Sequence, residues 1–335
     1  MVSENPAGTR GKKIIMNVLH ITNMYPSAEK PYFGIFVKEQ IESIKKAGIN
    51  VEVRRVGRDS GGYLKTFKLW KEAEWADIIH CHFGHTGSAS VPLKYIAKKP
   101  LVVSYCGGDI FGDVGYDNRY HLKGRITARI NSLLSGCIDC AIVKSANMAG
   151  KVRSKRIEVI PNGVDMTLFR EIPLDEARFK SGAGERGDKI ILFLGQKKIP
   201  VKNFALFKEA SAYAGPGLKC IELEGIPRDE VVYFMNSADV CVLTSRHEGS
   251  PNAVKEAMAC ARPIVSVDAG DVRGLIGNVE GCFVVPYEAR EIGRAIAEAL
   301  SYKRTASRDR IYDSGLDMES TARKIIDVYE SLLKA

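Results

Sequence analysis

Short runs of apolar residues alternate along this chain with segments whose apolar residues recur at helical spacing. The run at 14–21 has the length of a strand, a helical pattern follows at 35–44, and an extended pattern resumes at 51–53. Apolar runs that do not alternate with polar residues are typical of parallel strands covered on both faces. The first half is therefore predicted to be an α/β domain with a parallel sheet. Its other strands are predicted at 77–80, 101–104, 141–143 and 157–160.

The pattern restarts in the second half, after a polar segment rich in glycine, proline and charged residues. A final helix from about Glu319 carries an apolar stripe, so we expect it to pack on the rest of the protein. Two doubly wound Rossmann-like domains in tandem are therefore expected. The strands of the second half are predicted at 190–194, 219–223, 240–243 and 263–267. The predicted divisions are a flexible tail at 1–12, a first domain at 13–165, a linker at 166–188, a second domain at 189–315 and a docked helix at 316–335.

Charge is distributed unevenly between the two halves. The 335 residues carry a formal net charge of +9. Residues 1–165 hold 25 Lys and Arg against 15 Asp and Glu, whereas residues 166–335 hold 24 against 25. The whole basic excess lies in the first half, which indicates that the two halves meet different partners. A basic surface favours encounters with phosphate-rich ligands and membranes.

The composition excludes several classes of protein. Hydrophobic residues make up 45% of the chain and charged residues 27%, which excludes a wholly disordered chain and a small disulfide scaffold. A membrane-spanning helix is not expected, because no run of about 18 consecutive apolar residues occurs, and the first residues lack the apolar core of a secretory signal. Cys137 and Cys140 form a CxxC pair without a second pair or suitable histidines, so Cys140 is interpreted as part of a buried strand. The eight cysteines are expected to be reduced, in the cytoplasm.

The segment 243–259 combines a strand end, a tight polar loop and the start of a helix at Ser250-Pro251. Ser is favoured as a helix N-cap and Pro at the first helical position. A helix N-terminus at the carboxyl end of a parallel strand offers free N–H groups to a phosphate. Glu256 lies about 7–8 Å further along the axis, where a carboxylate could bind a ribose, and Glu248 precedes the helix. From the spacing alone, a capped helix with two solvated glutamates explains the segment equally well.

The segment 248–259 resembles the E-x7-E signature of retaining nucleotide-sugar glycosyltransferases, family 4 in particular. Glu248 and Glu256 occupy its two acidic positions. The resemblance implies the GT-B fold, in which two Rossmann-like domains face each other across a cleft, the first for the acceptor and the second for the donor. By this resemblance Glu248 touches the donor sugar and Glu256 the ribose. Further matches, in the family's order, are 25–40, 77–84 and 161–165, so that the resemblance covers about residues 14 to 333.

The resemblance also implies contacts to the donor phosphates and base. The backbone of Gly34 is expected to face the diphosphate, and Lys202 matches a lysine that contacts the phosphates. Gln196 stands where the family usually has an arginine, so one phosphate contact is expected to be lost unless nearby Lys197 or Lys198 compensates. Taken alone, Gly34 is explained by a plain turn and Lys202 by a basic loop. The remaining expected donor contacts are Gly225 and Ile226 in the base-binding loop, and Gly249, Ser250, Pro251 and Asn252 in the phosphate-binding turn.

Cys106 stands where the family usually has a histidine that contacts the donor sugar. A cysteine cannot supply the same hydrogen bond. On the acceptor side we therefore expect that His82, His85 or Asp109 substitutes beside Cys106, or that the donor preference differs. A partly buried polar residue without a direct role remains the simpler explanation for each histidine.

The expected chemistry follows from the charge that develops on the leaving diphosphate. Positive groups and N–H donors aimed at that charge lower the barrier. Lys202, the helix N-terminus after Pro251 and the backbone of Gly34 can supply them, and no Asp-x-Asp metal motif occurs. This agrees with the metal independence that the resemblance implies. Transfer without a cofactor is expected, with Lys202, Glu248 and Asp109 as catalytic residues. A UDP-sugar is the favoured donor.

The segment 119–133 mixes four basic residues with spaced Leu and Ile, and a second basic cluster lies at 151–156. A basic amphipathic helix can lie on an anionic membrane, which suits an enzyme with a lipid-linked acceptor. The ordinary explanation is a helix whose apolar face packs in the core. Nucleic-acid binding is not expected, because no aromatic-interleaved basic motif accompanies the charge. A cytoplasmic protein with peripheral association at the inner face of the membrane is predicted.

Three functions are compatible with these residues. The first is a retaining glycosyltransferase of cell-surface polysaccharide or glycolipid synthesis, which acts on a glycan or lipid-linked acceptor. The second is a nucleotide-sugar 2-epimerase of the same fold, which needs no acceptor. The third is a non-catalytic nucleotide-sugar-binding protein, which the departures at Gln196 and Cys106 would suit. The first is our prediction.

Overall fold

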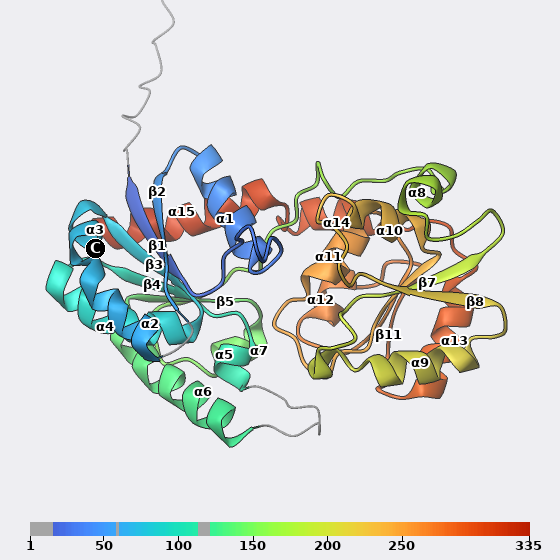
Figure 1. Cartoon of the computed structure of the whole chain (residues 1–335), viewed down its shortest axis with the longest axis horizontal. Helices are drawn as coiled ribbons and strands as arrows, with labels where there is room; N and C mark the ends of the chain where they lie inside the picture. The colour runs from blue at the N-terminus through green and yellow to red at the C-terminus, as the bar shows by residue number, and fades with distance from the viewer. Residues whose placement is uncertain (1–15, 58–59, 113–120) are drawn as a thin grey trace, which may run out of the picture.

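The computed structural model describes residues 16–57, 60–112 and 121–335, and the predicted tail at 1–12 lies outside them. Each half of the described chain folds around one parallel sheet, which gives two lobes side by side (Figure 1). All the strand pairs are parallel. The predicted doubly wound α/β architecture is therefore confirmed.

The first sheet has six strands in the order β2-β1-β3-β4-β5-β6. Its central strands β3, β4 and β5 are buried along their whole length, as expected for a parallel sheet covered on both faces. All the strands predicted in this half are present within three residues of their expected bounds. They are β1 (Asn17–Thr22), β2 (Asn50–Arg55), β3 (Ile78–His82), β4 (Leu101–Ser104), β5 (Cys140–Val143) and β6 (Ile157–Val159).

Helices cover both faces of the first sheet. One face packs on α1 (Ile35–Lys46) and α15 (Met318–Lys334), whose apolar residues share a buried cluster with the strands. The other face packs on α3 (Trp70–Trp75) and α4 (Gly84–Ala97), and α6 (Leu122–Leu134) packs against α4. The shorter helices of this lobe are α2 (Ser60–Leu64), α5 (Gly108–Phe111) and α7 (Ala146–Ala149), with 3-10 turns at Lys65–Leu69 and Ser135–Cys137.

The second sheet has five strands in the order β11-β10-β9-β7-β8. One face packs on α9 (Phe204–Tyr213) and α13 (Ala289–Ala299), and the other on the remaining helices. The edge strand β11 was not predicted, because its four half-buried residues carry little periodicity. The strands are β7 (Lys189–Phe193), β8 (Leu218–Glu222), β9 (Val240–Leu243), β10 (Ile264–Val267) and β11 (Cys282–Val285). The helices of the other face are α8 (Leu174–Ser181), α10 (Val231–Ser237), α11 (Asn252–Ala259), α12 (Val272–Ile276) and α14 (Ser307–Asp313).

The segment 166–188, which was expected to be a linker, is largely packed into the second lobe. It contains α8, which packs on α10. Phe169 precedes that helix and is fully buried in the core of the second lobe. The polar composition of the segment therefore marks exposed faces of a helix and its turns.

The last helix, α15, crosses back from the second lobe to the first. In Figure 1 it is the red helix that lies along the blue and green lobe, with the C-terminus at its far end. Ile325, Val328 and Tyr329 are buried in the same cluster as Val18 of β1. The apolar stripe found in the sequence is thus the surface by which this helix docks.

Three buried histidines lie beneath α15 on β1 and β3, where His20 pairs in register with His80. His80 uses both ring nitrogens, Nδ1 with the Tyr329 hydroxyl and Nε2 with Ser104 Oγ at 2.8 Å. His20 Nδ1 lies 2.9 Å from Nε2 of His82. Burial lowers the pKa of His20 to about 3 and holds the pKa values of the other two well below the ordinary value. The neutral rings therefore form a hydrogen-bonded layer that includes the C-terminal helix.

Replacing Tyr329 by Phe should destabilise the fold, because the ring stays and His80 Nδ1 loses its buried partner. We expect the free energy of unfolding, measured by urea denaturation at pH 7.5, to fall by about 1–3 kcal/mol. Tyr312→Phe is the matched control, since Tyr312 is exposed on α14, and should change it by less than about 0.5 kcal/mol. Equal stabilities of the two variants would contradict the role of Tyr329.

Candidate functional site

The two lobes touch through loops that follow the carboxyl ends of their central strands. A Cβ atom at Gly249, after β9, would lie 3.0 Å from Met148 Sδ, 3.3 Å from Lys144 Cβ and 3.6 Å from the carbonyl oxygen of Cys106. A larger residue at this position would have to displace the Met148 side chain, so the two lobes approach closely here. Open α/β sheets bind their ligands outside the carboxyl ends of the strands, so this contact region is the candidate site.

Lys202 and Glu248, two of the predicted catalytic residues, form an ion pair in the second lobe. Lys202 Nζ lies 2.5 Å from Glu248 Oε1, and both side chains are mostly buried. The Thr244 hydroxyl, at the end of β9, donates to the carbonyl oxygens of Lys202 and Asn203 at 3.1 and 3.0 Å. Thr244 was not predicted, yet it fixes the turn that carries the lysine. A cation and a carboxylate are therefore held together beside the strand end.

Helix α11 begins at Asn252, with Pro251 as its N-cap, slightly later than the predicted start at Ser250-Pro251. No side chain caps its N-terminus and its first turn contains no acidic residue. The first N–H groups of a helix have no intrahelical partner, so they are available to an anion. Glu256 lies on the same helix and is buried. The order predicted from the sequence, with Glu248 before the helix and Glu256 along it, is present in the structure.

Glu256 is paired with Arg228, which also binds a carboxylate of the first lobe. Arg228 Nη2 lies 2.7 Å from Glu256 Oε1, and Nε and Nη2 lie 2.8 and 3.0 Å from the two oxygens of Glu39 on α1. Although burial disfavours its charge, the two carboxylates raise the pKa of Arg228. Burial raises the pKa of Glu39, against the lowering effect of the Arg228 hydrogen bond. Sequence reasoning missed both residues, although Arg228 directly follows the predicted base-binding loop.

Gly34 immediately precedes α1, one turn and a half before Glu39. Its φ of 73° is in the left-handed region, and a Cβ there would lie 2.5 Å from the Met24 backbone. No side chain caps α1 and its first turn has no acidic residue, so its N–H groups are also available to an anion. Because Glu39 is tied to Glu256 through Arg228, this helix end lies beside the second lobe.

Lys255, next to Glu256 on α11, is fully buried and ties that helix to the segment that joins the lobes. Its Nζ donates to the carbonyl oxygen of Asn162 at 2.6 Å, and Asn162 Nδ2 donates to Asn252 Oδ1 at 3.4 Å. Burial lowers the pKa of Lys255 to about 8. The donor-side helix is therefore fixed to the connecting chain at two points.

The other predicted donor contacts lie further out. Gly225 is exposed with a φ of 77°, and Ile226 packs partly on the core of the second lobe. Gln196 and Lys197 are exposed, and Lys197 Nζ lies 2.7 Å from Glu222 Oε1. Lys197 is therefore paired at the edge strand β8, apart from the pair of Lys202 and Glu248.

The predicted acceptor-side residues are brought together only in part. Asp109 accepts hydrogen bonds from the backbone N–H groups of Gly84, Gly107 and Cys106 at 2.7, 2.8 and 3.0 Å, so its carboxylate organises this loop. His82 is buried in the histidine layer beneath α15. His85 is half-buried at the start of α4 and stacks on Tyr63.

Cys106 lies opposite Gly249, at the contact between the lobes. Burial raises the pKa of its thiol to about 12, so the thiol is neutral at pH 7. Its Sγ lies 3.8 Å from the carbonyl oxygen of Ser104. The position of the family's histidine is thus occupied at the site by a weak, uncharged donor.

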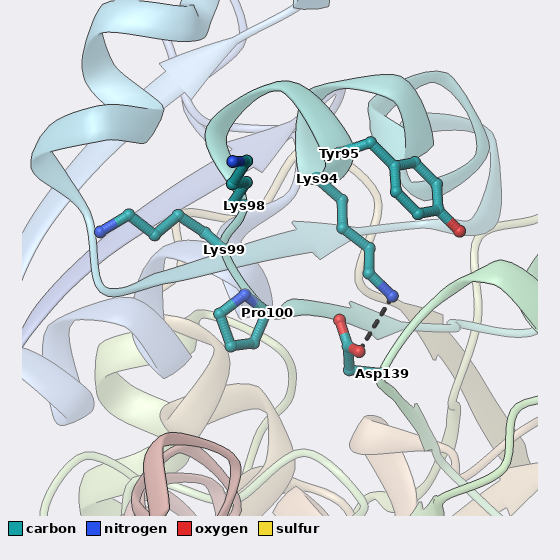
Figure 2. A pocket seen from close by; sticks show the side chains of 6 residues that line it. All are labelled: Lys94, Tyr95, Lys98, Lys99, Pro100 and Asp139. Carbon is teal, nitrogen blue, oxygen red and sulfur yellow. Dashed lines mark hydrogen bonds and ion pairs between the residues drawn. The ribbon is translucent and has the colours of Figure 1, made fainter. Parts of the chain in front are cut away.

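A separate surface cavity of about 280 Å³ lies at the amino ends of β4 and β5, on the opposite side of the first sheet from the lobe contact. Figure 2 shows its lining, with Lys94 reaching Asp139 at 2.9 Å. Because this cavity faces the amino ends of the strands, it is distinct from the contact region between the lobes. Its lining residues are Lys94, Tyr95, Lys98, Lys99, Pro100 and Asp139.

Helix α6 carries the described part of the basic amphipathic segment, whereas Arg119 and Tyr120 lie outside the described residues. Its apolar stripe does not pack in the core. Leu122, Ile126, Ile130 and Leu133 are exposed by 71%, 52%, 46% and 47%. Its buried face instead contains Ala128 and Asn131. The outward apolar stripe overturns the ordinary explanation of a core-facing helix. Among the described residues, no helix has the length and apolarity to cross a bilayer.

Comparisons with known proteins agree with these observations. The family model described as Glycosyltransferase Family 4 matches residues 35–168, and the model described as Glycosyl transferases group 1 matches residues 191–302. TuaC of Bacillus subtilis (strain 168), named as a glycosyltransferase of teichuronic acid biosynthesis, is 23% identical over 354 aligned positions. The alignment covers 84% of this chain and 88% of TuaC.

Solved structures match over nearly the whole chain. Sucrose-phosphate synthase from Thermosynechococcus elongatus has a TM-score of 0.77 at 15% identity, over 95% of this chain and 99% of that one. HepE of Anabaena, in complex with UDP-glucose, has a TM-score of 0.74 at 19% identity, over 94% and 100%. The predicted GT-B fold is thereby confirmed, with sheets of six and five strands.

Replacing Gly34 by Ala tests whether α1 must begin with glycine. Gly182→Ala is the matched control, because Gly182 has a φ of 61° with no atom within 4 Å of an added Cβ. The control should lose only the cost of the left-handed backbone, about 1–2 kcal/mol of unfolding free energy. Gly34→Ala should lose more unfolding free energy, measured by urea denaturation, because its Cβ also meets the Met24 backbone. Equal losses in the two variants would contradict this role of Gly34.

Proposed function

Because the chain belongs to the group 1 and family 4 glycosyltransferases, we propose that it moves a sugar from a UDP-sugar to a hydroxyl group of a glycan or lipid-linked acceptor in polysaccharide synthesis, with retention of configuration. The observation that carries the proposal is the pair of Lys202 and Glu248, 2.5 Å apart, beside the open start of α11. A cation, a carboxylate and the free N–H groups of α11 therefore lie close together near one strand end. The likeness to TuaC supports a polysaccharide product, and the complex of HepE supports a UDP-sugar.

In the proposed binding mode the donor takes the orientation that the family resemblance implies. Its diphosphate lies between the N-terminus of α11, Lys202 and the N-terminus of α1 at Gly34. The ribose binds Glu256, further along α11, and the base meets the loop at Gly225. The transferred sugar then points past Glu248 towards the loop at Cys106, on the acceptor side.

The chemistry requires that negative charge on the leaving diphosphate be stabilised. When the bond between the sugar and the diphosphate breaks, its electron pair goes to a diphosphate oxygen. The acceptor oxygen forms the new bond at the same carbon, and the proton of its hydroxyl group goes to the leaving diphosphate oxygen. When the donor binds, Lys202 leaves its ion pair with Glu248 and pairs with the diphosphate. Glu248 is then free to accept hydrogen bonds from the sugar hydroxyls. Fixed cationic and N–H groups act strongly in a site from which water is excluded. These groups make a metal ion unnecessary in this proposal.

The epimerase alternative needs an acid/base pair over the bound sugar. Asp109, the carboxylate of the loop at Cys106, is already bound to three backbone amides. The geometry therefore favours the transferase.

Replacing Lys202 by Ala should lower the turnover of the donor without preventing folding. We expect kcat for UDP release from UDP-sugars, assayed in EDTA, to fall by about 10²–10³-fold, as for the loss of one stabilising donor at a transition state. Lys180→Ala is the control, because Lys180 pairs with Glu176 at 3.0 Å on α8, outside the site. It should retain kcat within about twofold. Equal rates in the two variants, or activity that requires a divalent metal, would contradict the mechanism.

We further propose that α6 places the first lobe on an anionic membrane that carries the acceptor. Its exposed apolar stripe is flanked by Lys123, Arg125 and Arg129 on the same helix. Apolar residues inserted at the headgroup boundary, together with basic side chains, produce binding that depends on anionic lipid.

Flotation with vesicles tests this surface. The protein should float with vesicles that contain phosphatidylglycerol and not with pure phosphatidylcholine. Replacing Ile126 and Ile130 by Asp should reduce the partition coefficient by at least about tenfold, since two apolar side chains leave the interface. Phe179→Asp, on α8 of the second lobe where Phe179 is 88% exposed, should have no effect. Binding that survives the double substitution would contradict the proposal.

A further inference from the structure

Arg228 lies between two largely buried carboxylates that come from different lobes. Glu39 belongs to α1 of the first lobe, and Glu256 to α11 of the second. Only about a fifth of the Arg228 and Glu39 side chains is exposed, and less of Glu256. Charges this far from water need partners with good geometry. The orientation of each carboxylate therefore depends on the guanidinium.

The guanidinium is fixed on more than one side. Nε and Nη2 both bind Glu39, at 2.8 and 3.0 Å, in the paired geometry that makes arginine–carboxylate contacts directional. Its flat face lies 4.7 Å from the ring centroid of Phe169, which is fully buried. With these contacts made, Nη2 has a defined direction towards Glu256.

That direction sets how Glu256 presents its oxygens. Nη2 lies 2.7 Å from Oε1 of Glu256. An ionised carboxylate has about four acceptor sites, so one such contact leaves capacity for further donors. The vicinal hydroxyls of a ribose are donors of that kind. A carboxylate that is already held in one orientation binds these hydroxyls without the entropic cost of ordering its side chain when the ligand binds.

We propose that Arg228 is a positioning residue that orients Glu256 towards the ribose hydroxyls of the donor, and that Glu39 supplies the anchor from the opposite lobe. The inference rests on the proposed function, in which Glu256 binds the ribose. It adds that recognition of the ribose depends on a residue of the acceptor lobe. Neutralising Glu39 frees the guanidinium and removes the fixed orientation of Glu256, while the contacts to phosphate and base stay in place.

A comparison of two nucleotides, with and without the ribose hydroxyls, isolates the contribution of the ribose contact to binding. We would measure the dissociation constants of UDP and 2′,3′-dideoxyuridine diphosphate by calorimetry, for the unmodified protein and for Glu39→Gln and Arg228→Lys. Glu39→Gln keeps the shape of the side chain, and Arg228→Lys keeps the charge without the planar fork. Glu171→Gln is the matched control, because Glu171 pairs with Arg304 at 2.6 Å outside the site. Thermal melting establishes that each variant is folded.

The unmodified protein should bind UDP about 10–100-fold more tightly than the dideoxy nucleotide, as expected for hydrogen bonds to a charged group. In Glu39→Gln and Arg228→Lys this ratio should fall to about threefold or less through weaker UDP binding, with dideoxy binding within about twofold of its original value. Glu171→Gln should keep the original ratio.

The other outcomes overturn the inference in distinguishable ways. If both variants keep the original preference for UDP over the dideoxy nucleotide, Arg228 only joins the lobes. The same conclusion follows if they lose affinity for both nucleotides equally. A ratio that rises would show that Arg228 competes with the ribose. If the unmodified protein binds neither nucleotide, the proposed function fails as well. If it binds UDP with no preference over the dideoxy form, Glu256 is not the ribose ligand and this inference fails with that assignment.

Discussion

Buried carboxylates that need cationic partners determine how the site is built. Glu248 and Glu256 lie at the lobe contact because α11 and its preceding loop put them there. A buried carboxylate without a cation is costly, so each is matched by one basic residue. Lys202 serves Glu248 and Arg228 serves Glu256. Lys202 comes from the turn between β7 and α9, which Thr244 holds from the end of β9, and Arg228 comes from the loop before α10.

The same requirement links the lobes. Arg228 has more N–H donors than Glu256 accepts from, and Glu39 on α1 accepts from Nε and Nη2. On the other side of α11, the buried ammonium of Lys255 finds the carbonyl oxygen of Asn162 in the connecting chain. Helix α15 completes the connection through the hydrogen bond between His80 and Tyr329. Polar contacts thus act together with the apolar docking of α15 to fix the orientation of one lobe relative to the other.

The fold was largely predictable from the sequence, because it depends on patterns that are local. Buried parallel strands read as continuous apolar runs, and helices repeat at their own spacing, so ten of the eleven strands were placed. The site was predictable where one segment carries it, as in the loop and helix with Glu248 and Glu256. The roles of Arg228 and Glu39 were not, since 189 residues separate them. The sequence also could not show that three backbone amides bind the carboxylate of Asp109, because Gly84 is distant along the chain and the loop conformation brings the three N–H groups together.

Helix α6 has two faces with different surroundings. The outward face carries the exposed apolar stripe. On its inward face, Asn131 Nδ2 donates to the carbonyl oxygen of Asp109 at 2.8 Å, and the Asp109 carboxylate accepts from the backbone of Cys106, opposite Gly249. Two hydrogen-bonded contacts therefore connect the helix with the exposed stripe to the contact between the lobes. In the proposed membrane orientation, an acceptor held beside α6 would approach a site whose near wall is fixed by the same helix.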